Sequence, residues 1–189
     1  MEKTIKNLTQ AFIGESQARN RYTVYSKIAK KEGYEKIAET FMLTADQEAE
    51  HAKWLMRMIN ELKDGNSAYD EISVNAGAPT ILGETKENLK SAIGGENHEH
   101  TSMYPEFSKI AEEENLENIS LRLKAIAKAE ENHEDRYKKL LKELEDNTVF
   151  EKETEVVWQC RKCGYIHTDK KSPLECPSCG HPQAYFEVK

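Results

Sequence analysis

Glu48-Ala49-Glu50-His51 decides the fold of this chain, because a matching stretch, Glu130-Glu131-Asn132-His133, follows it at a displacement of 82 residues. The surrounding sequence repeats at the same displacement: Ser26-Lys27-Ile28-Ala29 matches Ser108-Lys109-Ile110-Ala111. Similarity that recurs at one fixed displacement indicates an internal duplication. We therefore expect two copies of a two-helix unit.

Each copy carries a glutamate and a histidine three residues apart. On an α-helix such residues lie one above the other, about 4.5 Å apart along the axis. A carboxylate and an imidazole at this spacing can hold one metal ion. A single Glu-x-x-His in a glutamate-rich chain is more typical of a solvated helical face, but its recurrence at a fixed displacement favours a metal site.

The composition favours long amphipathic helices over a sheet protein. The chain has 189 residues, of which 38% are hydrophobic and 32% are charged, a balance expected of helices with salt-bridged outer faces. A formal net charge of −7 argues against a nucleic-acid partner, which needs a basic surface. The N-terminal stretch is not a signal peptide, and no run approaches the roughly 20 apolar residues of a spanning helix. We expect a cytoplasmic protein with no membrane partner.

Helical periodicity predicts four helices in two pairs. The stretch between the pairs, about residues 64–82, contains Gly, Asn, Ser and Pro and should form a long crossover. The expected helices run from about Leu8 to the turn at Gly33, from Tyr34 to Lys63, from Glu84 or Thr85 to Glu114, and from Leu116 to Leu144.

The third predicted helix contains residues that weaken a helix. Pro105 removes a backbone hydrogen bond and should kink it, and Gly94 and Gly95 should each cost about 1 kcal/mol. Such interruptions often mark a place where local geometry serves function. We therefore expect a functional role for this helix.

Acidic residues interrupt the apolar face of every predicted helix. A buried carboxylate costs several kcal/mol unless it is paired or bound to a cation, and four or five of them need about two divalent cations. Carboxylates with one imidazole per metal suit iron or manganese better than zinc. The set matches that of ferritin-like di-iron carboxylate bundles. The candidates are Glu15 in the first helix, Glu48 and His51 in the second, Glu96 and Glu99 in the third, and Glu130 and His133 in the fourth. We expect His98 and His100 at the surface or around the ligands.

All four cysteines lie near the C-terminus, in two Cys-x-x-Cys motifs separated by 12 residues: Cys160 with Cys163, and Cys176 with Cys179. This spacing strongly predicts one metal bound by four thiolates, and the glycine after each motif lets the backbone close around the sulfurs. Spacing alone leaves zinc and iron open. His167 and His181 should not be ligands, because four thiolates complete the site. A module of this size has little core, so the metal should supply much of its folding energy.

These patterns divide the chain into two expected domains. We predict an all-α four-helix bundle at residues 1–146, a linker at residues 147–154 and a small β-rich metal-binding domain at residues 155–189. This division rests on the change from helical periodicity to a cysteine-rich stretch.

The chain resembles the rubrerythrins over essentially its full length. The resemblance rests on Glu15 with Ala18-Arg19-Asn20-Arg21-Tyr22, the two Glu-x-x-His motifs, Gly95-Glu96-Asn97-His98-Glu99-His100-Thr101 with Met103-Tyr104-Pro105, and the cysteine motifs with their neighbours. It implies a ferritin-like domain with two irons followed by a rubredoxin-like domain with one iron at the four cysteines. It further implies that Glu15, Glu48, Glu96, Glu99, Glu130 and His133 bind the two irons, while His51 exchanges with Glu99 as the oxidation state changes.

The resemblance also implies an activity: reduction of hydrogen peroxide to water. Electrons would come from an NAD(P)H-dependent reductase or a rubredoxin, and a head-to-tail homodimer would place one subunit's rubredoxin-like module beside the other's di-iron site. Glu99 and His51, with Tyr22 and Tyr104 as possible hydrogen-bond donors, are the expected catalytic residues. A core role with a satisfied hydroxyl fits the two tyrosines as well.

Two alternatives come from other functional classes. The first is a ferroxidase, an iron-handling protein or an oxygen-reducing ferritin-like protein, against which the attached cysteine module and Glu99 count. The second is a non-enzymatic interaction protein with a zinc ribbon, which the interior glutamates contradict.

Overall fold

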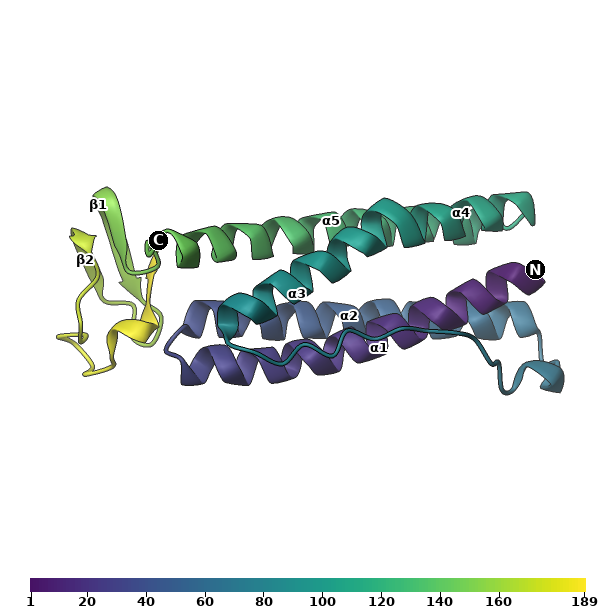
Figure 1. Ribbon diagram of the computed structural model, residues 1–189, viewed down its shortest axis with the longest axis horizontal. Coiled ribbons are helices and arrows are strands. Elements are labelled where there is room, and N and C mark those ends of the chain that lie inside the picture. Colours follow the sequence, from purple (N-terminus) through teal and green to yellow (C-terminus); the bar gives the residue numbers. More distant parts are fainter.

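The computed structural model describes all 189 residues and shows a bundle of long helices with a small sheet at one end (Figure 1). This confirms the predicted fold class, an all-α four-helix bundle with a small C-terminal β-rich domain. No helix combines the length and apolar character that crossing a bilayer requires. The elements are α1 Glu2–Lys31, α2 Glu35–Lys63, the 3-10 turn Ser67–Tyr69, α3 Thr85–His98, the π-helical turn Glu99–Met103, α4 Tyr104–Glu113, α5 Glu117–Glu145, β1 Glu151–Cys160, β2 Ile166–Lys171, the 3-10 turn Gln183–Tyr185 and β3 Phe186–Val188.

The duplication extends to the turns that join the helices of each pair. Gly33 between α1 and α2 has φ +88°, and Asn115 between α4 and α5 has φ +62°. After each of them, a backbone N–H donates to the carbonyl oxygen five residues earlier, at 2.9 Å in the first turn and 2.8 Å in the second. This is the Schellman ending, whose left-handed residue is most often glycine or asparagine. Equivalent positions therefore end the first helix of each pair in the same way.

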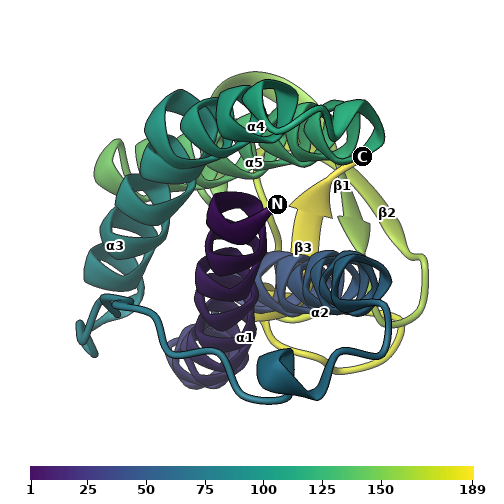
Figure 2. The ribbon, with the colours of Figure 1, turned by 90° about the vertical axis from the view of Figure 1, so that its right-hand side faces the viewer.

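The predicted crossover connects the two helical pairs. It leaves the end of α2, passes through the short 3-10 turn and runs beside α1 to the start of α3 (Figure 1). The hydroxyl of Tyr25 on α1 donates to the carbonyl oxygen of Ile81 at 2.7 Å. In the end view, α1 and α2 lie opposite α4 and α5, and the crossover passes outside α1 (Figure 2).

The third predicted helix is divided, which corrects the expectation of one helix kinked by proline. Its two α-helical parts, α3 and α4, are joined by the π-helical turn, whose last N–H, that of Tyr104, donates to Glu99 O. Pro105 lies in the first turn of α4, where its missing N–H costs little. Gly94 and Gly95 lie inside an uninterrupted α3. The distortion therefore falls on the segment that carries Glu99, and π-turns are frequent at functional sites.

The core of the bundle consists of two apolar halves with a charged layer between them. Along α1, Ala11 belongs to one half and Ala18 to the other, with Glu15 in between. Along α5, Ile126 belongs to the first apolar half and Tyr137 to the second, with the charged layer between them. The packing on both sides fixes the depth at which the acidic side chains of all the long helices meet.

The C-terminal sheet has the antiparallel order β2-β1-β3. Trp158 is fully buried with Cys160, Cys176 and Phe186, and its indole N–H donates to the carbonyl oxygen of Asp169 at 3.0 Å. The sheet starts earlier than predicted: β1 begins at Glu151, inside the expected linker of residues 147–154. This stretch is ordered because it pairs with β2, with Glu151 opposite Lys171.

The sheet packs against the end of the bundle that is formed by the α1–α2 turn and the C-terminal end of α5. The ring of Tyr34 stacks on Phe150, with centroids 6.2 Å apart and an interplanar angle of 8°. Arg161 on the cysteine module forms an ion pair with Glu39 on α2. The N-terminus lies at the opposite end of the bundle (Figure 1).

Candidate metal centre

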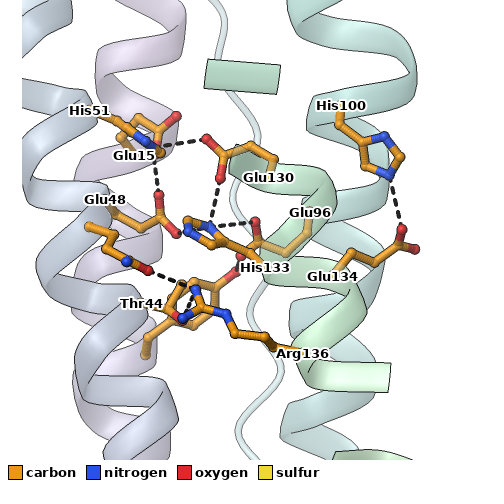
Figure 3. A network of polar contacts seen from close by, with 12 residues as sticks. Glu15, Thr44, Glu48, His51, Glu96, His100, Glu130, His133, Glu134 and Arg136 are labelled. Carbon is orange, nitrogen blue, oxygen red and sulfur yellow. Dashed lines mark hydrogen bonds and ion pairs between the residues drawn. The ribbon is translucent and has the colours of Figure 1, made fainter. Parts of the chain in front are cut away.

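The charged layer brings together six of the predicted ligands from α1, α2, α3 and α5 (Figure 3). They form two groups that share Glu48 and Glu130. Within each group, one ligand atom per residue lies within 4.8 Å of every other. Two shared carboxylates are what two neighbouring cations need for bridging. The first group is Glu15, Glu48, His51 and Glu130, and the second is Glu48, Glu96, Glu130 and His133.

The two groups are related by the duplication. His51 Nδ1 lies 2.9 Å from Glu130 Oε1, and His133 Nδ1 lies 3.1 Å from Glu48 Oε1. Each histidine therefore reaches the glutamate of the opposite repeat, and the imidazole rings stack with centroids 5.9 Å apart. The site is built between the two helical pairs, so neither repeat can form it alone.

The buried carboxylate oxygens of the site fit cations. Glu15 Oε2, Glu48 Oε1, Glu96 Oε2 and both carboxylate oxygens of Glu130 each lie 2.7–3.7 Å from Nδ1 of His51 or His133. Two imidazole nitrogens cannot satisfy five carboxylate oxygens, and an unsatisfied buried polar group costs about 1–3 kcal/mol, or more if it is charged. These atoms converge on shared centres, and carboxylate oxygens with one imidazole per centre suit iron or manganese.

The pKa values show how strongly burial and neighbouring carboxylates disfavour negative charge in this layer. Burial, followed by the nearby charge of Glu48, raises the pKa of Glu15 to about 7. Burial also raises the pKa of Glu96 to about 8, although His133 opposes the shift. Burial disfavours charge on His133, but the adjoining carboxylates outweigh it and raise its pKa to about 11. Positive charge therefore stabilises the site.

Glu99 stands apart from the other predicted ligands. It lies on the π-helical turn and is 8% exposed, and it belongs to neither group, while His51 does. Burial and then the carboxylates of Glu15, Glu96, Glu130 and Glu48 raise its pKa well above the usual value. Glu99 therefore lies next to the two groups, while His51 belongs to the first of them.

Tyr22 and Tyr104 each donate a hydrogen bond to a predicted ligand. The Tyr22 hydroxyl lies 2.5 Å from Glu96 Oε1, and the Tyr104 hydroxyl donates to Glu15 Oε1. Both tyrosines are buried and occupy equivalent positions in the two repeats. Each tyrosine orients the carboxylate of the opposite helical pair.

Sequence reasoning missed Glu134, which supports the site from outside. Its carboxylate is buried and accepts from His100 Nε2 at 2.9 Å and from Lys138 Nζ at 2.8 Å. His100 lies on the π-helical turn, so this contact ties the turn to α5 (Figure 3). The spacing of four residues from Glu130 places Glu134 on nearly the same helix face, which could have identified it. His98 is exposed, as predicted.

The four cysteines form a second cluster, with sulfurs 3.8 Å apart in the Cys160–Cys179 pair and 3.6 Å apart in the Cys163–Cys176 pair. The backbone N–H of Tyr165, followed by the neighbouring thiols, lowers the pKa of Cys163 to about 6, which favours the thiolate that binds metal. Gly164 and Gly180 have φ values of +79° and +68°, so these glycines permit the tight turn after each motif. His167 and His181 are not part of the cluster.

Comparisons with known proteins agree with both sites. Residues 6–141 match the family model described as Rubrerythrin, and residues 158–187 match Rubrerythrin, rubredoxin-like domain. A putative rubrerythrin of Methanocaldococcus jannaschii is 58% identical, with 100% of this chain and 94% of that protein aligned. The rubrerythrin of Porphyromonas gingivalis is 52% identical over 98% of this chain and 89% of the relative.

A solved structure described as the fully reduced, all-ferrous state of nigerythrin is similar across both parts of the chain. It superimposes with a TM-score of 0.65 at 30% identity, covering 98% of this chain and 86% of that structure. The match includes the helical bundle and the cysteine module. The chain therefore belongs to the rubrerythrin family, whose members are oxidoreductases with a di-iron site in the bundle and an iron site in the rubredoxin-like domain.

Proposed function

We propose that this protein is a non-haem di-iron peroxidase that reduces hydrogen peroxide to water. The observation that carries the proposal is the pair of ligand groups sharing Glu48 and Glu130, in one chain with a four-cysteine site. The first feature holds two metal ions side by side, and the second can pass electrons one at a time. A storage protein has no need of the second feature.

The reaction consumes one hydrogen peroxide, two electrons and two protons and yields two water molecules. When bound, two ferrous ions supply the two electrons that break the O–O bond and act as Lewis acids on its oxygens. The chain must then supply protons and hold its carboxylates in place. Glu99, buried beside the ligand groups, is the proposed proton donor to the departing hydroxide.

Three further residues prepare the site in this proposal. Tyr22 and Tyr104 fix the orientation of Glu96 and Glu15 through their hydroxyls. His51 reaches the shared carboxylate Glu130, and we propose that His51 would hold a ferrous ion where Glu99 would hold a ferric ion. A carboxylate suits the more highly charged ferric ion, and a neutral imidazole suits the ferrous ion.

We propose that the electrons enter through the iron site of the four cysteines. Within one chain this module is far from the di-iron site, because α5 continues from His133 to Glu145, about 18 Å at 1.5 Å per residue, before the module begins. Electron transfer slows exponentially with distance. A head-to-tail homodimer, with the module of one subunit beside the bundle of its partner, shortens the path. A rubredoxin or an NAD(P)H-dependent reductase is the proposed donor.

Stopped-flow oxidation of the fully reduced, iron-loaded protein tests the proposal, with hydrogen peroxide and oxygen in parallel. We expect rapid oxidation by peroxide, much slower oxidation by oxygen, and then the red absorbance of the oxidised cysteine site. Faster oxidation by oxygen than by peroxide would refute the peroxidase and favour the ferroxidase or oxygen-reducing alternative.

A further inference from the structure

A cleft of about 390 Å³ opens at the surface and is lined by Glu99, which lies beside the metal centre. Its walls come from α1, the crossover at residues 76–79 and the segment from Gly95 to Met103. Among the predicted ligands, only Glu99 lines it. Four other polar side chains line the cleft: Gln10, Gln17, Arg21 and His98. These side chains can form hydrogen bonds with a small molecule that enters it.

Two helical glycines line this cleft next to ligands of the metal centre. Gly14 precedes Glu15 on α1, and Gly95 precedes Glu96 on α3. A Cβ added at Gly14 would meet nothing within 4 Å, and one added at Gly95 would meet only Arg21 Nη2 at 3.6 Å and the Tyr22 hydroxyl at 3.9 Å. Neither glycine has the positive φ that requires glycine. Since glycine weakens a helix relative to alanine, the fold itself gives no reason for either one.

Polar atoms of α1 in the cleft wall also lack partners. Arg21 Nε and Gln17 Oε1 are buried without a hydrogen-bond partner. The residues Arg21 and Gln17 themselves line the cleft, so their side chains give its wall polar groups. A guanidinium donates hydrogen bonds, and an amide both donates and accepts them, as hydrogen peroxide does.

From these observations we propose that this cleft is the entrance for hydrogen peroxide, and that Gly14 and Gly95 keep it open by having no side chain. The inference rests on the proposed peroxidase function, because it names the route of that substrate. The competing route passes His51, whose side chain is 16% exposed.

The test replaces each glycine by alanine and by leucine, with Gly94→Leu as the matched control. Gly94 adjoins Gly95 on α3 and is exposed, and it does not line the cleft. We expect kcat/KM for peroxide to fall by about tenfold in Gly14→Leu and Gly95→Leu, with smaller effects in the alanine variants. Iron content and melting temperature should stay at or above those of the parent protein.

A binding measurement distinguishes slower entry of a small molecule through the cleft from a change in the metal centre itself. Azide, a small anion, is mixed with the oxidised protein, and its association is followed by absorbance. A narrowed entrance should slow azide association and dissociation equally, so that the rates fall by about tenfold while Kd is unchanged.

Unchanged azide rates in both leucine variants would refute the entrance, as would an equal slowing in Gly94→Leu. If the parent protein fails to turn over peroxide, the proposed function fails. The azide rates still decide whether the cleft is the route to the metal centre.

Discussion

His51 Nδ1 lies closer to Glu130 Oε1, on the opposite helical pair, than to Glu48 Oε2, on its own helix: the distances are 2.9 Å and 3.1 Å. The Glu-x-x-His motif therefore contributes side chains to both ligand groups. Its histidine faces one group, while its glutamate is shared by both. Glu130 belongs to both groups and Glu99 to neither, so we expect Glu130 to hold the metal ions and Glu99 to act on the substrate.

Replacing Glu130 should remove iron from the bundle. In Glu130→Gln we expect iron affinity to fall by at least about 100-fold, because both groups lose a shared ligand.

Glu99→Gln should retain its ferrous iron, since Glu99 lies outside both groups. Oxidation of this variant by peroxide should slow by about tenfold, because the proton donor is lost. Metal analysis and stopped-flow absorbance measure the two effects. Loss of ferrous iron from Glu99→Gln would contradict this division of roles.

Removing the tyrosine hydroxyls should slow turnover without loss of iron. In Tyr22→Phe and Tyr104→Phe, Glu96 and Glu15 lose a hydrogen bond that orients them, and we expect peroxide turnover to fall by about tenfold. Tyr25→Phe is the control, because the Tyr25 hydroxyl donates to the crossover instead. If both variants keep the parent rate, the tyrosines are core residues only.

Stability of the metal-free protein should fall as the pH rises. Burial raises the pKa of Glu15 to about 7 and of Glu96 to about 8, from an ordinary value of 4.5. Their protonated forms therefore favour folding fully below about pH 4.5, and this contribution is lost as the pH rises through 7 and 8. His133, whose pKa rises to about 11, acts in the same direction.

Urea unfolding measures this effect. Between pH 5.5 and pH 8 we expect the metal-free protein to lose roughly 5 kcal/mol of unfolding free energy from the two carboxyls alone. The iron-loaded protein is the control, because cations replace the protons and its stability should change little over this range. Equal pH dependence in the two forms would show that these carboxyls do not titrate as the structure indicates.

The cysteine site should be separable from the peroxide reaction. Cys163 is exposed, whereas Cys160 and Cys176 belong to the module's core, so Cys163→Ala removes a metal ligand without removing a side chain of that core. We expect loss of the red absorbance and of turnover driven by NAD(P)H and a reductase. A single oxidation of the chemically reduced protein by peroxide should keep its rate. Lys162→Ala, exposed within the same motif, is the control.

Sustained turnover by Cys163→Ala at the parent rate would mean that electrons reach the bundle directly. The four-cysteine site would then have another purpose. NAD(P)H consumption measured at several reductase concentrations distinguishes direct electron transfer to the bundle from turnover that is limited by a slow reductase.

The sequence by itself determined the helical pairs, the fold class and the six residues that meet in the two ligand groups, although it also predicted Glu99 among them. Local spacing is sufficient for this: Glu48 and His51 must share a helix face, and their recurrence as Glu130 and His133 places an equivalent pair on the second unit. The two Cys-x-x-Cys motifs define their cluster for the same reason. The Schellman turns at Gly33 and Asn115 likewise follow from local chemistry.

Only the tertiary structure decided how these parts face one another. Which carboxylates are shared, and that His51 rather than Glu99 joins the ligand groups, depends on how the two helical pairs pack. The π-helical turn, its tie through His100 to Glu134, and the cleft beside Gly14 and Gly95 depend on contacts between distant segments. Spacing along one helix fixes which side chains share a face, but the distance between faces is set by packing of the apolar halves on either side.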